Sequence, residues 1–216
     1  MKKKNNVEEI FGITKNVKKI CDFGCGDGEF LNSLPNSLEK FGVEFSKELV
    51  QELEFKNEDI KFFDTISFFK NKNINSFFDI IYVRDVLEHL TNPYQIMENL
   101  IKYLSKDGLL IIEGPIEENY NIIYYFSKLT GFLKHIFKIK NYFTPYHITR
   151  TNHYSQKLFF KRLNDVKIYS YTSFETGWPY KHNGILRNLI SNINFIFFYK
   201  KNIKFNNRFV CTLKKL

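Results

Sequence analysis

The chain lacks the features expected of secreted or membrane-spanning proteins. It has only three cysteines, Cys21, Cys25 and Cys211, and an odd number in strand-like contexts argues against a secreted disulfide framework. No uninterrupted apolar run reaches the roughly 18 residues of a spanning helix. The Met-Lys-Lys-Lys start is not followed by the apolar core of a signal peptide. We therefore expect a cytoplasmic protein without integral membrane association.

Acidic residues almost disappear in the second part of the chain. Residues 1–120 carry 15 Lys and Arg against 21 Asp and Glu, whereas residues 121–216 carry 17 against two. The net charge of +9 is therefore the sum of −6 and +15. A coding bias toward Lys would raise the number of cations but would not remove acids. The basic part points to an anionic partner, which could be a phosphorylated substrate, a membrane surface or a nucleic acid.

The first half alternates strand-like and helix-like patterns. Hydrophobic residues make up 44% and charged residues 25% of the chain, which is a globular balance. Continuous apolar runs predict buried parallel strands at 19–23, 41–45, 60–63, 77–83 and 109–112. Helices are expected at 47–55, capped by Ser46, and at 93–104, with a turn at Asp107-Gly108 before the fifth strand. This rhythm is typical of a doubly wound α/β sheet.

The second half is less regular. Helical periodicity recurs at 122–137 and 155–163, a helix is expected near 185–193, and strands are expected at 166–174 and 208–213. The apolar stripe of the 122–137 helix is interpreted as a buried or lid face. Its flanking residues Lys128, Lys134 and Lys138 leave peripheral membrane contact open.

The most informative motif is the segment 21–30, CDFGCGDGEF. Gly24, Gly26 and Gly28 follow a predicted strand and open a helix, where glycine allows a ligand to approach the backbone and free amides face that ligand. Glu44 ends the second predicted strand, 20 positions after Gly24. Its carboxylate can accept hydrogen bonds from two ribose hydroxyls. The first strand–helix–strand unit is therefore predicted to bind a nucleoside.

The residues around these glycines favour one kind of nucleoside. The spacing is GxGxG, not the GxGxxG of dinucleotide sites. Asp22 and Asp27 flank the glycines, and their carboxylates would repel a pyrophosphate but suit an ammonium and a sulfonium. No separate zinc or disulfide pattern competes with this interpretation.

With these motifs the sequence resembles class I S-adenosylmethionine-dependent methyltransferases, of the small-molecule branch with an LEH motif. The resemblance rests on DFGCGDG at 22–28, GVEFS at 42–46, FDIIYVRDVLEHL at 78–90 and GLLIIEGP at 108–115. It implies one Rossmann-like domain over residues 1–216, with a seven-stranded, mostly parallel sheet of order 3-2-1-4-5-7-6 whose last strand is antiparallel. The aromatic and basic segments 117–151 and 175–204 are interpreted as substrate-lid insertions within it.

The resemblance also implies a cofactor, S-adenosylmethionine, and residues that bind it. Gly24, Cys25, Gly26 and Gly28 would line the methionine part and the sulfonium, and Asp22 would orient the loop or meet the amino group.

The remaining implied contacts follow the next strands. Glu44 would hold the ribose hydroxyls and Phe45 would border the adenine. Asp64 and Thr65 occupy the region that faces the adenine amino group in the family. Arg84 and Asp85 would border the methionine tail and the transferred methyl group.

Three residues are candidates for a general base, which a hydroxyl acceptor would need. They are His147, His153 and Asp85, and each histidine could instead be an ordinary loop residue. The sequence does not choose among them.

The other polar residues of interest are given structural roles. Glu88 and His89 of the LEH motif are interpreted as capping or buttressing the loop after the fourth strand. His135 and His182 lie in the insertions and rank lower. His and acidic residues are scattered, so no metal site is expected.

The favoured function is O-methylation of a small anionic or sugar-containing metabolite, such as a glycan or nucleotide-sugar precursor in polysaccharide biosynthesis. A membrane-surface methyltransferase for a lipid or quinone head group is the alternative. An RNA methyltransferase is less favoured, because Arg84-Asp85-Val86-Leu87 stands where base-methylating enzymes carry an NPPY-like tetrad. A non-catalytic binding module is disfavoured by the intact glycine loop.

Overall fold

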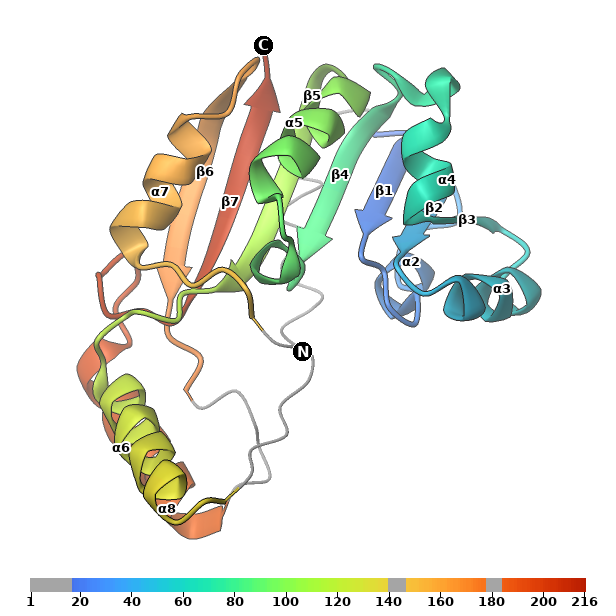
Figure 1. Cartoon of the computed structure of the whole chain (residues 1–216). Helices are drawn as coiled ribbons and strands as arrows, with labels where there is room; N and C mark the ends of the chain where they lie inside the picture. Colours follow the sequence, from blue (N-terminus) through green and yellow to red (C-terminus); the bar gives the residue numbers. More distant parts are fainter. Residues whose placement is uncertain (1–16, 140–146, 178–183) are drawn as a thin grey trace. The chain divides into compact units, whose positions relative to one another are not determined.

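The computed structural model describes residues 17–139, 147–177 and 184–216. These residues form a seven-stranded mixed sheet flanked by helices, with the strand order β3-β2-β1-β4-β5-β7-β6 and β7 antiparallel to its neighbours (Figure 1). The predicted fold class and strand order are confirmed.

The strands are β1 (Lys19–Phe23), β2 (Glu39–Glu44), β3 (Ile60–Asp64), β4 (Phe78–Arg84), β5 (Leu104–Pro115), β6 (Val166–Phe174) and β7 (Arg208–Lys215). The α-helices are α2 (Glu29–Asn32), α3 (Lys47–Lys56), α4 (Thr65–Lys70), α5 (Pro93–Tyr103), α6 (Ile122–Ile136), α7 (His153–Lys161) and α8 (Gly184–Phe198). Two short 3-10 helices are η1 (Lys72–Ile74) and η2 (Leu87–His89).

The described chain divides into two compact units. The first holds residues 17–83, 99–111 and 214–216, and the second holds 84–98 and 112–213 apart from the gaps. The single-domain organisation and the lid role of 117–151 and 175–204 stay predictions. Parts of both segments, 140–146 and 178–183 with His182, lie outside the described residues.

Parallel pairing joins the strands of the first unit. β1 pairs with β2 and β4, and β2 pairs with β3. The apolar residues of these strands are buried, as continuous apolar runs predict. Gly42 of β2 lies so close to β3 that a Cβ there would be 2.5 Å from the Phe62 ring. Only glycine therefore allows this ring to pack across β2.

Local sequence explains the helix boundaries of the first unit. Ser46 accepts a hydrogen bond from the amide of Leu49, so α3 begins where the cap predicts. The fifth strand begins earlier than expected, and it runs through Asp107. The φ of Asp107 is +63°, which is the left-handed conformation of a turn, so the predicted turn is present as an irregularity inside the strand.

The second unit has its own aromatic core. Phe160 of α7 and Phe209 of β7 are buried with ring centroids 5.6 Å apart, and Tyr171 of β6 stacks on Phe209 at 6.0 Å. Helix α7 begins two residues earlier than predicted. Asn152 caps it by accepting from the amides of Tyr154 and Ser155.

The apolar stripe of α6 is exposed, which corrects the buried alternative of the prediction, whereas the lid alternative stays a prediction. Tyr125, Leu129, Phe132, Leu133 and Ile136 are 43–62% exposed. Helix α8 lies alongside α6 in the second unit (Figure 1) and also exposes large apolar side chains. Among the described helices, none has the length and apolar character needed to cross a bilayer.

Candidate functional site

The glycine loop sits at the carboxyl end of β1, where doubly wound folds bind ligands. Gly24, Gly26 and Gly28 have φ values of +83°, +55° and +74°, a left-handed conformation that other residues rarely adopt. The amides of Gly24 and Cys25 donate to the carbonyl of Val43 at 2.8 and 3.0 Å, which ties the loop to β2. The loop is therefore held by β2 in a tight turn with left-handed glycines, as the glycine spacing predicts.

Glu44 joins the loop at the end of β2. Its Oε2 accepts a hydrogen bond from the Gly26 amide at 2.8 Å, and its Oε1 accepts one from the Phe45 amide at 2.7 Å. These contacts fix the carboxylate, and each oxygen keeps a lone pair for a ligand hydroxyl. A Cβ built on Gly26 would meet no described atom within 4 Å. Open space therefore lies beside the carboxylate.

The other residues implied for the cofactor have varied surroundings. Asp22 is buried beneath the loop. The Cys25 thiol is buried, and desolvation raises its pKa to about 12, so it stays protonated. Phe45 is half exposed and meets the edge of Phe23 at 5.6 Å between centroids. It therefore offers a ring at the end of β2.

Asp64 and Thr65 have structural partners in the first unit. The Asp64 carboxylate caps α4 by accepting hydrogen bonds from the amides of Ile66 and Ser67. A hydrogen bond from the Ser67 hydroxyl, together with those from the two amides, lowers the pKa of Asp64. The Thr65 hydroxyl donates to the Glu44 carbonyl at 3.4 Å. The predicted role of both residues beside the adenine stays a prediction.

A separate polar cluster belongs to the second unit and begins with Asp85. Asp85 has a φ of +54° directly after β4, a left-handed conformation that few non-glycine residues adopt. Arg208 Nη2 lies 2.8 Å from Asp85 Oδ1 and 3.0 Å from Glu113 Oε1. Burial alone would lower the pKa of Arg208, but the two carboxylates hold it above its usual value. The ion pair engages one oxygen of the Asp85 carboxylate.

His147 lies in the same cluster, beside the LEH residues. Its Nδ1 is 2.8 Å from Glu117 Oε1, and its ring meets the His89 ring edge-on at 4.8 Å. The carbonyl of Glu88 accepts from the amides of Ile148 and Thr149 at 2.8 and 3.0 Å. The predicted buttressing role of Glu88 is thus present in its backbone, which holds the His147 segment against η2.

His153 is the first residue of α7, not a loop residue. Its Nδ1 is buried, accepts or donates no hydrogen bond among the described residues, and its ring meets the edge of Tyr171 at 5.5 Å. Burial, aided by Lys157, lowers the pKa of His153, so its imidazole is neutral at pH 7. These contacts show His153 packing against Tyr171.

Comparison with known proteins now decides the family. A family model described as a methyltransferase domain matches residues 2–158, which is more than half of the chain. The chain belongs to the methyltransferase-domain family. It is an S-adenosylmethionine-dependent methyltransferase, and S-adenosylmethionine is its cofactor. The LEH subtype is carried by sequence resemblance alone.

Solved structures support the fold of this methyltransferase. A methyltransferase from Archaeoglobus fulgidus is 18% identical, with a TM-score of 0.59 over 98% of this chain and 92% of that one. The putative methyltransferase in a complex with the Haloferax volcanii Trm112 methyltransferase activator is 14% identical, with a TM-score of 0.63 and coverages of 99% and 92%. The plantazolicin methyltransferase BpumL, solved with S-adenosylhomocysteine, is 17% identical, with a TM-score of 0.59 and coverages of 99% and 81%. A search of curated proteins gives no match.

The residues of this methyltransferase fit the cofactor on structural grounds. Open space beside Gly26 and a fixed Glu44 carboxylate suit a ribose and a methionine chain. Glu44 also keeps hydrogen-bonding capacity beyond the two amides that it accepts from.

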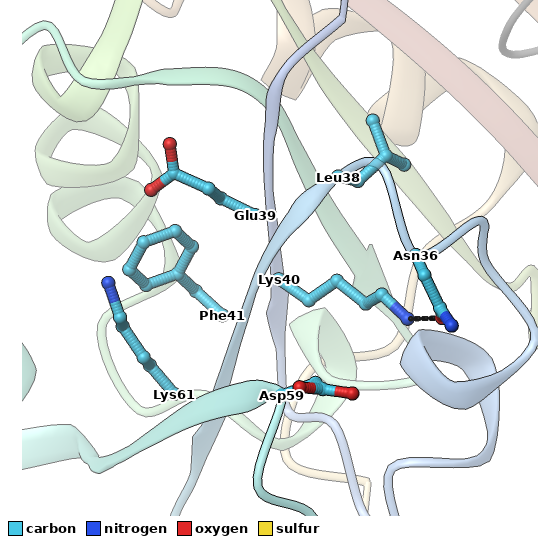
Figure 2. A pocket seen from close by; sticks show the side chains of 7 residues that line it. All are labelled: Asn36, Leu38, Glu39, Lys40, Phe41, Asp59 and Lys61. Carbon is cyan, nitrogen blue, oxygen red and sulfur yellow. Dashed lines mark hydrogen bonds between the residues drawn. The ribbon is translucent and has the colours of Figure 1, made fainter.

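One surface pocket of the first unit lies away from the glycine loop. It has a volume of about 260 Å3 and is lined by Asn36, Leu38, Glu39, Lys40, Phe41, Asp59 and Lys61 (Figure 2). It lies at the amino ends of β2 and β3, opposite the glycine loop. Lys40 extends there and donates to Asn36 Oδ1 at 3.3 Å, as Figure 2 shows. This pocket is therefore distinct from the glycine-loop site.

Sequence reasoning missed one grouping in this methyltransferase. Glu88, His89 and His147 each place a possible ligand atom within 4.8 Å of the others. His147 is 58 positions after His89, so spacing along the chain did not reveal it. The adjacent Glu-His pair was the available signal, since two metal-binding residue types stood side by side after a strand.

Proposed function

We propose that this methyltransferase O-methylates a small anionic or sugar-containing molecule. When bound, S-adenosylmethionine supplies a methyl group on a sulfonium, which is a good leaving group. The protein must therefore mainly position the acceptor and exclude water. The cofactor-binding residues in this proposal are Asp22, Gly24, Cys25, Gly26, Gly28, Glu44, Phe45, Asp64, Thr65, Arg84 and Asp85.

The observation that carries the choice of a hydroxyl is the His147–Glu117 pair. A carboxylate 2.8 Å from Nδ1 orients the ring, and its other nitrogen is left for an acceptor. An acceptor hydroxyl must lose its proton before or during methyl transfer, and this imidazole serves that step, directly or through a bound cation. Asp85 is occupied by Arg208 and His153 packs against Tyr171, so His147 is the preferred candidate of the three.

The charge of the second part supports an anionic acceptor. Residues 121–216 carry 17 Lys and Arg against two acidic residues. Cations in such excess raise the local concentration of anionic small molecules and speed their association. Uronic acids, sugar phosphates and nucleotide sugars are the classes that fit.

The cofactor half of the proposal is tested by calorimetric titration with S-adenosylhomocysteine. Glu44→Gln is expected to weaken binding by about 1–3 kcal/mol, because it removes a charged acceptor of ribose hydroxyls. Glu52→Gln is the matched control, since Glu52 lies on the exposed side of α3 and pairs with Lys56. Equal affinities for the wild type and Glu44→Gln would contradict the site assignment.

The acceptor half is tested by turnover. The protein is incubated with S-adenosylmethionine and each acceptor class, and S-adenosylhomocysteine release and a methyl mass gain are measured. A product methylated on oxygen, with a lower rate for His147→Gln at unchanged cofactor affinity, is expected. Methylation only of nitrogen or carbon acceptors would overturn the proposal.

A second candidate function is favoured by the exposed helices. Helices α6 and α8 expose apolar side chains and contain no acidic residue. Apolar faces flanked by cations bind the interface of anionic membranes. In this case the acceptor would be a lipid or quinone head group, and the test of membrane binding is argued below.

A further inference from the structure

Glu88, His89 and His147 form a compact group of ligand-type side chains in the second unit. Each offers one oxygen or nitrogen within 4.8 Å of the other two. Three ligand atoms on one ion with ~2.1 Å bonds lie roughly 3–3.6 Å from one another, so the separations must shorten by up to roughly 1–2 Å for all three side chains to bind one ion. The hydrogen bonds from Ile148 and Thr149 to the Glu88 carbonyl hold the two segments at this spacing.

An independent observation at Glu88 points to a missing ligand. The residue is only 6% exposed, and its Oε2 accepts no hydrogen bond from the described residues. A buried carboxylate oxygen without a partner is costly, and such atoms are rare in folded proteins. A cation would satisfy this oxygen.

The surroundings of His147 match those of a metal ligand. Its Nδ1 faces Glu117 Oε1 at 2.8 Å, so Nε2 is the nitrogen available to an ion. Metal-binding histidines commonly donate their other N–H to a carboxylate, which fixes the ring and makes the ligand more basic. Arg150 Nε lies 3.5 Å from Glu117 Oε2 and forms an ion pair with the same carboxylate.

We propose that Glu88, His89 and His147 bind one divalent transition-metal ion. Two imidazoles and one carboxylate suit Mn2+, Fe2+, Co2+ or Zn2+ better than the all-oxygen ions Mg2+ and Ca2+. Three protein ligands leave positions open, as in catalytic sites.

The use of the open positions rests on the proposed function, whereas the binding of the ion does not. An acceptor hydroxyl bound to such an ion has a lowered pKa, so it gives its proton to water and meets the methyl group as an alkoxide. His147 then acts on the acceptor through the ion and not as a free base.

The test uses the full chain with Mn2+ and with Zn2+, in the absence of cofactor. Calorimetry is expected to show one ion per chain. His89→Gln and His147→Gln are each expected to weaken binding at least about tenfold. His135→Gln is the matched control, because His135 is exposed in the last turn of α6. Titration with S-adenosylhomocysteine, run on the same samples, shows whether each variant is folded and tests the proposed function separately.

A spectroscopic measurement keeps the proposal testable if a variant does not fold. Pulsed electron paramagnetic resonance of wild-type protein with Mn2+ is expected to show couplings to histidine nitrogen. No ion bound by the wild type, couplings to oxygen ligands alone, or unchanged affinity in both folded histidine variants would overturn the proposal.

Discussion

At the residue scale, Gly26 combines a backbone conformation that requires glycine with open space for a ligand. Its φ of +55° disfavours any side chain, and the space beyond its Cα is open. We predict that Gly26→Val leaves the fold intact at a cost of about 1–3 kcal/mol and abolishes binding of S-adenosylhomocysteine. The side chain would strain the loop and fill the space that the cofactor needs. Calorimetry measures the binding, and urea denaturation measures the stability.

The matched control for this substitution is Gly131→Ala. Gly131 lies in α6, its Cβ would also meet no described atom within 4 Å, and its backbone is helical. Binding is expected to stay at the wild-type level. Full binding by Gly26→Val would show that the glycine loop does not hold the cofactor.

Glu175 is a buried acid whose ionisation is linked to stability. Desolvation raises the pKa of Glu175 to about 7. It does so although the backbone amide of Gly177 and the side-chain amide of Asn121 donate to the carboxylate oxygens at 2.8 and 3.1 Å. Because the folded pKa lies above the unfolded value of 4.5, its contribution to stability is present at low pH and is lost as the pH rises toward and past 7.

We predict that Glu175→Gln removes this pH dependence. The free energy of unfolding of the wild type should fall by up to roughly 3 kcal/mol more than that of the variant between pH 5 and pH 8. Chemical denaturation at several pH values measures this difference in slope, whatever the stability of the variant at any one pH. Parallel profiles for the two proteins would refute the linkage.

The features that sequence reasoning located best are backbone features with a local cause, whereas the cofactor roles stay predictions. Gly24 and Gly26 follow β1 with positive φ values, and Glu44 ends β2 and accepts from the Gly26 amide. The grouping of His147 with His89 depends on a long connection folding back onto η2, and no local pattern encodes it. For the same reason the pairing of Asp85 with Arg208, 123 positions apart, was missed.

At the element scale, capping decides where α7 begins. Asn152 Oδ1 accepts from the amides of Tyr154 and Ser155, and Ser155 Oγ accepts from the Asn152 amide at 3.0 Å. We predict that Asn152→Ala lowers the free energy of unfolding by about 1 kcal/mol, because two amides lose their partner. Thermal and urea denaturation measure the loss. Asn188→Ala, an exposed change inside α8, should cost nothing and serves as control.

The same cap explains why this helix was predicted two residues late. The amphipathic pattern begins at Ser155, which is a good cap by itself, but in the structure the side chains of Asn152 and Ser155 each accept from the other's backbone amide and together form a capping box. The buried strands of the first unit were predicted closely because their apolar runs are bounded by glycine and polar residues. The sequence left a buried and a lid face of α6 open, since periodicity identifies an apolar stripe but does not identify what covers it.

At the scale of the whole molecule, charge and exposed apolar surface occur in the same part of the sequence. The segment 121–216 has a net charge of +15, and it contains both α6 and α8. Large exposed apolar patches on a single chain usually mark an interaction surface. An anionic membrane surface complements both properties, which is why lipid or quinone acceptors form the second candidate class.

This candidate predicts salt-dependent binding to vesicles. The protein should sediment with vesicles containing phosphatidylserine, and less with pure phosphatidylcholine, because each basic residue near an anionic surface contributes about 1 kcal/mol. Binding should weaken as the salt concentration rises. Phe132→Asp, at a position 62% exposed on α6, should lower it at least about tenfold, since a ring that would enter the lipid is replaced by a repelled charge.

Phe55→Asp is the control that distinguishes binding through α6 and α8 from non-specific hydrophobic adsorption to the vesicles. Phe55 is 91% exposed on α3 in the first unit, so its replacement changes charge and apolar area without touching α6 or α8. Vesicle binding should be unchanged in this variant. If both variants lose binding equally, or if neither loses it, the α6 and α8 helices are not the contact surface. The small anionic acceptors of the first candidate would then be the ones to pursue, because the basic segment would still need an anionic partner.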